Sequence, residues 1–394
     1  MKKSLLATAI LASTCFFSNA LYAADINFIS YDGNILAKNK AELTDSNPAL
    51  KKLVSLANKA LKVEIDPVTN KTLLSASGDK HDYFSFGPYW WPNPDTKDGL
   101  PYVRRDGEYN MDTKTAATDK MRMIRFAKDV QNLGLAYYFT DNKAYAEKAK
   151  QQLDAWFVNP KTRMNPNMDH AQAIPGRVDG RGIGIIDSRL LIGVMDSVEM
   201  LRPTMTDKEY NAVVKWYADF RDWLVTSRNG FEEDNWHNNH GSWYDAQVVA
   251  FSLFTHDMDL AKKRLEITQM RRIGGQFDIE GKQGAELERT KPWHYSNFNL
   301  EAYNLLGRYG ELAKVDVWNY NIDKHSLENG YNFIAKNVVD TNIWEYKGLK
   351  ERDVNIAYEN MLNAKRAYKD PIFDKAVEKL ESANKSNIEN LLYK

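Results

Sequence analysis

The sequence has almost no cysteine. Its only one, Cys15, lies in an N-terminal segment that we expect to be removed, so the mature chain would carry no thiol. That absence excludes a disulfide framework, a cysteine nucleophile and a cysteine-ligated zinc site. Disulfides are dispensable in a chain of 394 residues because it can bury a large core.

An excess of charge of one sign is also missing. Lys plus Arg and Asp plus Glu both number 53. Proteins that bind nucleic acid need a strongly basic face, so this composition points away from a nucleic-acid partner. An anionic ligand would have to be met by a local cluster of cations instead of by the field of the whole molecule.

The chain lacks an apolar run long enough for a membrane span. Lys2 and Lys3 precede an apolar stretch over residues 5–17, and small residues follow up to Ala23. A span needs about 20 apolar residues, whereas this layout is typical of a secretory signal peptide. We therefore predict a signal peptide over residues 1–23, a periplasmic or secreted mature protein, and no membrane association after cleavage.

Helical spacing dominates the rest of the chain. Thr206 and Glu209 form a capping box, and apolar residues recur at helical spacing from Tyr210 to Leu224. Similar amphipathic runs cover residues 119–139, 142–157, 187–201, 244–255, 259–273, 297–311 and 371–392. They come in neighbouring pairs with short joints, and we find no convincing run of alternating strands. This pattern predicts an all-α fold, a toroid of antiparallel helix hairpins forming a complete or incomplete (α/α) barrel, in one domain over residues 24–394.

Two irregular stretches interrupt the helices, at residues 75–118 and 164–184. Compact domains rarely keep so long a loop without a use. The first is read either as a structural arm or as a wall of a sugar-binding cleft, with flat aromatic rings for sugar faces and arginines for carboxylates. The second would hold polar side chains toward the same cleft. The candidate substrate-binding residues in the two stretches are Trp90, Trp91, Arg104, Gln172 and Arg181.

Two clusters of chemical groups stand at predicted helix starts. Residues 236–245 combine amides, imidazoles and indoles, and residues 286–296 combine carboxylates, cations, an imidazole and a phenol. His237 and His240 have a spacing that could share a metal, but no HExxH motif or carboxylate ligand accompanies them, so we predict no metal and no cofactor. The clusters add Asn238, Tyr244 and His294 to the candidate substrate-binding residues.

The same clusters hold the groups that cleave a uronate polymer by elimination. The proton next to a carboxylate becomes acidic only when the carboxylate charge is neutralised, and arginine with its planar fork suits that task. Asparagine can assist. Histidine or tyrosine can take the proton and protonate the leaving oxygen. Asn239, His240, Arg289 and Tyr295 supply this set without a metal.

These residues carry a family resemblance. Asn238-Asn239-His240 with Trp243, and Arg289 with Tyr295 ahead of Asn299-Leu300, resemble the alginate lyase superfamily. The stretches 89–94, 99–102 and 180–182 are similar to the same superfamily. The resemblance extends over residues 83–303 and is closest to polysaccharide lyase family thirty-eight, more distantly to family five.

The resemblance implies an (α/α) barrel that depolymerises alginate or a related polyuronate. Asn239 and Arg289 would neutralise the substrate carboxylate. Tyr295 would protonate the leaving oxygen and, for one stereochemistry, also take the proton. His240 would be the base for the opposite stereochemistry.

Two other functions fit the residues. An inverting glycoside hydrolase on the same barrel needs two carboxylates flanking the bond, and the candidates are Asp82, Asp187, Asp245, Glu286 and Glu288. A non-catalytic periplasmic sugar-binding protein would still bind after His240 or Tyr295 is removed and would show no turnover.

Overall fold

The structure is a computed structural model, and it describes residues 26–394. The predicted signal peptide lies outside the described residues. The helices are α2 (Gly33–Glu42), α3 (Pro48–Leu61), α4 (Lys120–Thr140), α5 (Lys143–Leu153), α6 (Ile192–Leu201), α7 (Asp207–Thr226), α8 (Arg228–Asp234), α9 (Asn239–Phe254), α10 (Met258–Ile267), α11 (Gly274–Gln276), α12 (Gly284–Leu287), α13 (Pro292–Ala313), α14 (Leu327–Val339), α15 (Tyr358–Ala367), α16 (Pro371–Glu381) and α17 (Glu389–Leu392).

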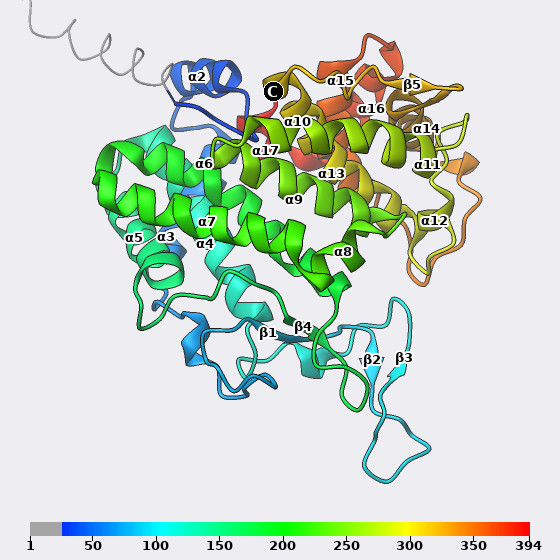
Figure 1. Cartoon of the computed structure of the whole chain (residues 1–394). Helices are drawn as coiled ribbons and strands as arrows, with labels where there is room; N and C mark the ends of the chain where they lie inside the picture. Colours follow the sequence, from blue (N-terminus) through cyan, green and yellow to red (C-terminus); the bar gives the residue numbers. More distant parts are fainter. Residues whose placement is uncertain (1–25) are drawn as a thin grey trace, which may run out of the picture.

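The longer helices form two layers (Figure 1). Helices α4, α6, α9, α13 and α15 contact one another in that order, and α3, α5, α7, α10, α14 and α16 pack against them. Helix α9 is buried along almost its whole length, as expected of a helix enclosed on all sides, whereas α7 buries a single stripe. This arrangement confirms the predicted (α/α) barrel.

The N-terminal end of the described chain is tied into the inner helices. The backbone N–H groups of Ile29 and Ser30 donate to the buried Asp196 carboxylate of α6, at 2.6 and 2.9 Å. The hydroxyl of Ser30 lies 3.1 Å from that of Tyr309 on α13. Because α17 also contacts α2 and α3, the last helix lies against the first ones.

The two irregular stretches lie together beyond one end of the helices (Figure 1). Strand β1 (Phe84–Phe86) pairs in parallel with β4 (His170–Ala173), and β2 (Trp90–Trp91) pairs with β3 (Val103–Arg104). A further short pair, β5 (Asn321–Ile322) and β6 (His325–Ser326), lies elsewhere. The second stretch is therefore partly a strand, where a surface loop was predicted.

A buried carboxylate fastens these stretches to the barrel. Asp187 accepts hydrogen bonds from Tyr83, Ser85 and Gln172, and it pairs with Lys120 of α4 at 3.0 Å. Burial alone would raise the pKa of Asp187, but Lys120 and the hydrogen bonds outweigh it and hold that pKa below its usual range. The arm thus has a fixed attachment to the helix ends.

The capping box predicted at the start of α7 is present, with both reciprocal bonds between Thr206 and Glu209.

Helix limits differ from the predictions at the starts of α9 and α13 and within the predicted helix 371–392. Helices α9 and α13 begin five residues earlier than their apolar spacing indicates. The first turn of α9 is built from polar residues, and α13 opens with a proline. The predicted helix 371–392 is broken where Asn384 donates its side-chain amide to the carbonyl of Leu380 at 2.8 Å, a local bond that competes with the helix.

Within residues 26–394, no helix is both long enough and apolar enough to cross a membrane.

Candidate active site

The starts of α9 and α13 bring the two predicted clusters together. The two helices pack against each other. Asn238 caps α9 by accepting a bond from the backbone N–H of His240 at 3.1 Å, and Pro292 occupies the first turn of α13, where proline is tolerated. Helix N-termini carry partial positive charge, so this end of the barrel favours an anionic ligand.

His240 is oriented by a buried carboxylate. Its Nδ1 lies 2.8 Å from Oε1 of Glu233, the penultimate residue of α8. Glu233 is fully buried, and burial raises the pKa of its carboxyl despite the neighbouring His240. When Nδ1 donates to Glu233, Nε2 keeps a free lone pair, which is what a general base requires.

Asn239 is held by a second buried carboxylate. Its backbone N–H donates to Oε1 of Glu286 at 2.6 Å, and its side-chain amide contacts both carboxylate oxygens at 2.9 and 2.8 Å. Burial raises the pKa of Glu286, although the donors from Asn239 oppose that shift. Glu286 also links the clusters, because its carbonyl accepts the N–H of Arg289.

The guanidinium of Arg289 lies over the phenol ring of Tyr295. The guanidinium carbon is 3.7 Å from the ring centroid. The same guanidinium donates to Asp106 of the arm, from Nη2 at 3.0 Å and Nε at 3.2 Å. Burial would raise the pKa of Asp106, but the bonds and charge of Arg289 prevail and lower it. Arg289 is therefore charged and fixed in place.

Tyr295 donates to or accepts from a second phenol. Its hydroxyl is 2.7 Å from that of Tyr89 in the arm. Burial, with Tyr89 adding to it, raises the pKa of Tyr295 far above its ordinary value, against the opposing charge of Arg289. The side chain is consequently a neutral phenol that carries its proton at physiological pH.

The structure links several of the predicted substrate-binding residues to one another, and Arg104 shares Asp106 with Arg289. The guanidinium carbons of Arg177 and Arg181 lie 5.2 and 5.8 Å from the ring centroid of Trp90. Arg181 also donates to the backbone carbonyl of Gln172 at 3.0 Å and to its side-chain oxygen at 3.1 Å. Three more predicted residues make contacts of the same kinds. Trp91 lies under the guanidinium of Arg105, and Arg104 forms an ion pair with Asp106. The exposed His294 stacks on Phe298.

Tyr244 is not brought to the site. It is 2% exposed, and its hydroxyl donates to the carbonyl of Leu224 at 2.9 Å, between α9 and α7. One helical turn beyond His240, the side chain points into the barrel wall, where it leaves no surface for a ligand.

Four residues of the site escape prediction as site residues: Tyr89, Asp106, Glu233 and Glu286. Tyr89 could be read from the sequence only as an arm aromatic, and Glu286 only as a hydrolase carboxylate. Nothing in the spacing of Asp106 or Glu233 signals a role, since each finds its partner through the fold. Among the described residues, no three His, Cys, Asp or Glu side chains gather as metal ligands do.

Comparison with known proteins identifies the family. The model of the alginate lyase family matches residues 67–344. A crystal structure of an alginate lyase from Bacteroides ovatus is similar over 94% of this chain and 99% of that one, with 33% sequence identity and a TM-score of 0.89. The chain belongs to the alginate lyase family. It is a polysaccharide lyase, which decides against the hydrolase and the non-catalytic binder.

More distant structures share the fold of this lyase. Alginate lyase A1-III from Sphingomonas species A1 is 14% identical, with a TM-score of 0.54 over 90% of this chain and 98% of that one. A His→Ala variant of A1-III complexed with a tetrasaccharide is 13% identical, with a TM-score of 0.51 over 84% of this chain and 91% of that one. No curated protein sequence matches this lyase significantly.

Proposed function

We propose that this lyase cleaves alginate or a closely related polyuronate by β-elimination at the group formed by Asn239, His240, Arg289 and Tyr295. The observation that carries the proposal is the stacking of Arg289 on Tyr295 at 3.7 Å. It puts a carboxylate-binding cation and a neutral phenol within reach of one sugar residue. The named substrate of the Bacteroides ovatus enzyme and the tetrasaccharide complex of A1-III support a polysaccharide of this class.

The first step is neutralisation of the substrate carboxylate. Arg289 keeps donors free, because Asp106 occupies only Nε and Nη2. The side-chain amide of Asn239, held by both oxygens of Glu286, assists Arg289 in this step. The positive ends of α9 and α13 add to the stabilisation of the dianionic state that forms when the proton leaves.

The second step moves two protons. A base takes the proton from C5, the C5–H electron pair forms the C4–C5 double bond, and the C4–O bond breaks. Tyr295 protonates the leaving oxygen, so the products are a new polymer end and an unsaturated uronate. When the C5 proton lies on the opposite side of the sugar ring from Tyr295, His240, supported by Glu233, is the base and the neutral phenol of Tyr295 is the acid. When the C5 proton lies on the Tyr295 side, Tyr295 acts as the base only as the phenolate, which the charge of Arg289 favours; it takes the C5 proton and passes that same proton to the leaving oxygen.

The carboxylates give little support to hydrolysis. Asp187 is occupied by Lys120 and three hydroxyl or amide donors, Asp245 by Arg264 and Arg272, and Glu286 by Asn239. Inverting hydrolysis needs an acid and a base that both face the substrate.

The test is a panel of purified mannuronan, guluronan and glucuronan followed by ultraviolet absorbance. An unsaturated uronate absorbs through its double bond conjugated with the carboxylate, and a hydrolytic product does not. Growth of that absorbance on at least one polymer is expected. Release of reducing ends without absorbance would overturn the proposal.

We also propose that this lyase belongs to polysaccharide lyase family thirty-eight and is exported. The stretches 89–94 and 180–182 support the first, and the charge and apolar pattern of residues 1–23 supports the second. Mass spectrometry of the protein from its native host is expected to show a chain that begins near residue 24. An intact Met1 on soluble cytoplasmic protein would contradict export.

A further inference from the structure

A pocket of about 570 Å³ lies next to the catalytic histidine and takes no part in the mechanism above. Its lining comes from α8 and the segment that leads to α9: Arg228, Phe231, Glu232, Asn235, Trp236 and His237. The indole of Trp236 has its centroid 6.1 Å from that of the His240 ring. A volume in this range is typical of sites for small molecules, so a ligand bound here would adjoin the reacting group.

Two aromatic residues in this lining are exposed. Phe231 is 72% exposed and Trp236 is 36% exposed. Single exposed apolar residues are common and need no explanation, but two in one pocket beside an active site indicate a binding surface. Flat aromatic rings match the apolar faces of pyranose sugars.

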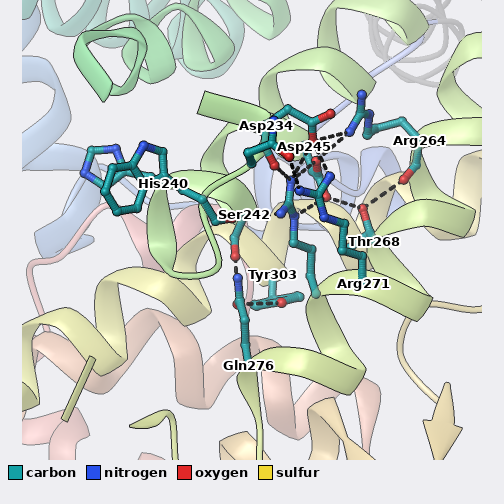
Figure 2. A network of polar contacts seen from close by, with 12 residues as sticks. Asp234, His240, Ser242, Asp245, Arg264, Thr268, Arg271, Gln276 and Tyr303 are labelled. Atoms are coloured by element: carbon teal, nitrogen blue, oxygen red, sulfur yellow. Dashed lines mark hydrogen bonds and ion pairs between the residues drawn. The ribbon is translucent and has the colours of Figure 1, made fainter. Parts of the chain in front are cut away.

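A network of charged side chains holds the backbone next to this pocket, and Figure 2 shows its members Asp234, Asp245, Arg264 and Arg271. Arg272 is held by the fully buried Asp245 at 3.0 Å, and it donates to the backbone carbonyls of Trp236 and Asp234, both at 2.8 Å. Arg271 donates to the side chain of Asn235 at 2.9 Å. A wall that is already ordered loses little conformational freedom when a ligand binds.

The arginine of the lining suits a carboxylate. Within the part of the chain that the structure describes, the side chain of Arg228 makes neither a hydrogen bond nor an ion pair, so its guanidinium is available for a planar two-point contact. The acidic member of the lining, Glu232, accepts a bond from the backbone N–H of Gly182 at 3.2 Å.

We propose that this pocket is a subsite for the uronate residues that neighbour the cleaved bond. Phe231 and Trp236 pack against sugar faces, and Arg228 pairs with the carboxylate of one residue. The inference rests on the proposed function, since it places a second part of the same polymer on the His240 side of the reacting group.

The test uses uronate oligosaccharides of increasing length with Phe231→Ala and Arg228→Gln. For each variant, kcat/KM on long oligosaccharides is expected to fall by about three- to tenfold, the range of one aromatic or charged contact. The shortest oligosaccharide that is still cleaved leaves the pocket empty, so its kcat/KM should stay at the wild-type value. The matched control is Met270→Ala, because Met270 is 71% exposed and does not line the pocket.

Two results would overturn the subsite. In one, both variants match Met270→Ala at every length. In the other, both lose activity equally at every length, which points to a disturbed His240. If the wild-type enzyme cleaves no polyuronate, the proposed function itself fails and the subsite fails with it, so the two failures are distinguishable.

Discussion

The hydroxyl of Tyr295 is hydrogen-bonded to that of Tyr89, and its ring is covered by the guanidinium of Arg289. Tyr295→Phe keeps the ring and its packing and removes only the hydroxyl. Turnover is expected to fall by about 10²–10⁴-fold, the usual loss for an acid–base group, while the melting temperature stays nearly unchanged. Initial rates on the best polymer, with thermal unfolding alongside, provide the measurement.

The control for this variant is Tyr89→Phe, which removes the partner hydroxyl and leaves the acid itself, so its effect should be much smaller. A folded Tyr295→Phe enzyme with nearly wild-type turnover would show that another group protonates the leaving oxygen.

Nδ1 of His240 lies 2.8 Å from Glu233, so in the proposed mechanism Glu233 orients the imidazole and balances its charge once it has accepted a proton. Glu233→Gln keeps the size of the side chain but removes the negative charge that stabilises the imidazolium. We expect kcat to fall by about tenfold or more with little change in KM. The fall should be larger on the polymer whose C5 proton faces His240 than on the one whose proton faces Tyr295.

Comparing mannuronan with guluronan separates this positioning role from a structural one. Loss of a merely structural contact would lower the melting temperature and both activities together. His240→Ala provides the upper limit of the selective effect, and Glu233→Gln should show the same polymer preference in weaker form.

At the scale of elements, the arm reaches the start of α13 through a tight turn. Asp106 contacts Arg289 and Thr290, and the carbonyl of Gly107 accepts a bond from Lys291 at 2.6 Å. Gly107 has φ +72°, and a Cβ there would lie 2.3 Å from Oγ1 of Thr290. Backbone conformation and space therefore both demand glycine at this contact.

Gly107→Ala is expected to lower both stability and activity, because the arm must withdraw and take Asp106 away from Arg289. The matched control is Gly78→Ala: it has the same φ but nothing within 4 Å of the added Cβ. That control should lose about 1–2 kcal/mol of stability from backbone strain alone and keep its kcat/KM. Denaturant unfolding and initial rates measure both, and equal activity losses in the two variants would contradict the role of the turn.

At the scale of the molecule, the buried Asp196 makes stability depend on pH. Burial raises its pKa to about 6, although the N–H groups of Ile29 and Ser30 act in the opposite direction. Because the folded state holds the Asp196 proton more tightly than the unfolded state does, protonated Asp196 stabilises the fold fully below about pH 4. This contribution is lost as the pH rises through about 6. The raised pKa corresponds to at most about 3 kcal/mol of the free energy of unfolding.

Asp196→Asn removes this titration. The free energy of unfolding of the wild-type protein should fall relative to the variant between about pH 4 and pH 7 and then run parallel to it. The difference between the unfolding free energies of the two proteins cancels the contributions of the other carboxylates. These include Asp187, whose lowered pKa makes stability change with pH in the opposite direction. A difference that is constant across this range would contradict the titration of Asp196 in the folded state.

The sequence by itself determined the helical class, the capping box of α7, and the two polar clusters that open α9 and α13. Helical spacing and capping are local, so they can be read over four to twenty residues. The polar first turn of α9 hid its true start, because periodicity is a signal of apolar residues. The roles of Asn239, His240, Arg289 and Tyr295 are still predictions, supported by their meeting at one end of the barrel.

Only the tertiary structure decided which groups complete the site. Tyr89 meets Tyr295 across 206 residues, and Asp106 meets Arg289 across 183. It also decided that Tyr244 points into the barrel wall and that Phe231 and Trp236 line a pocket. Sequence spacing defines the face of one helix, but contacts between distant segments depend on how whole elements pack.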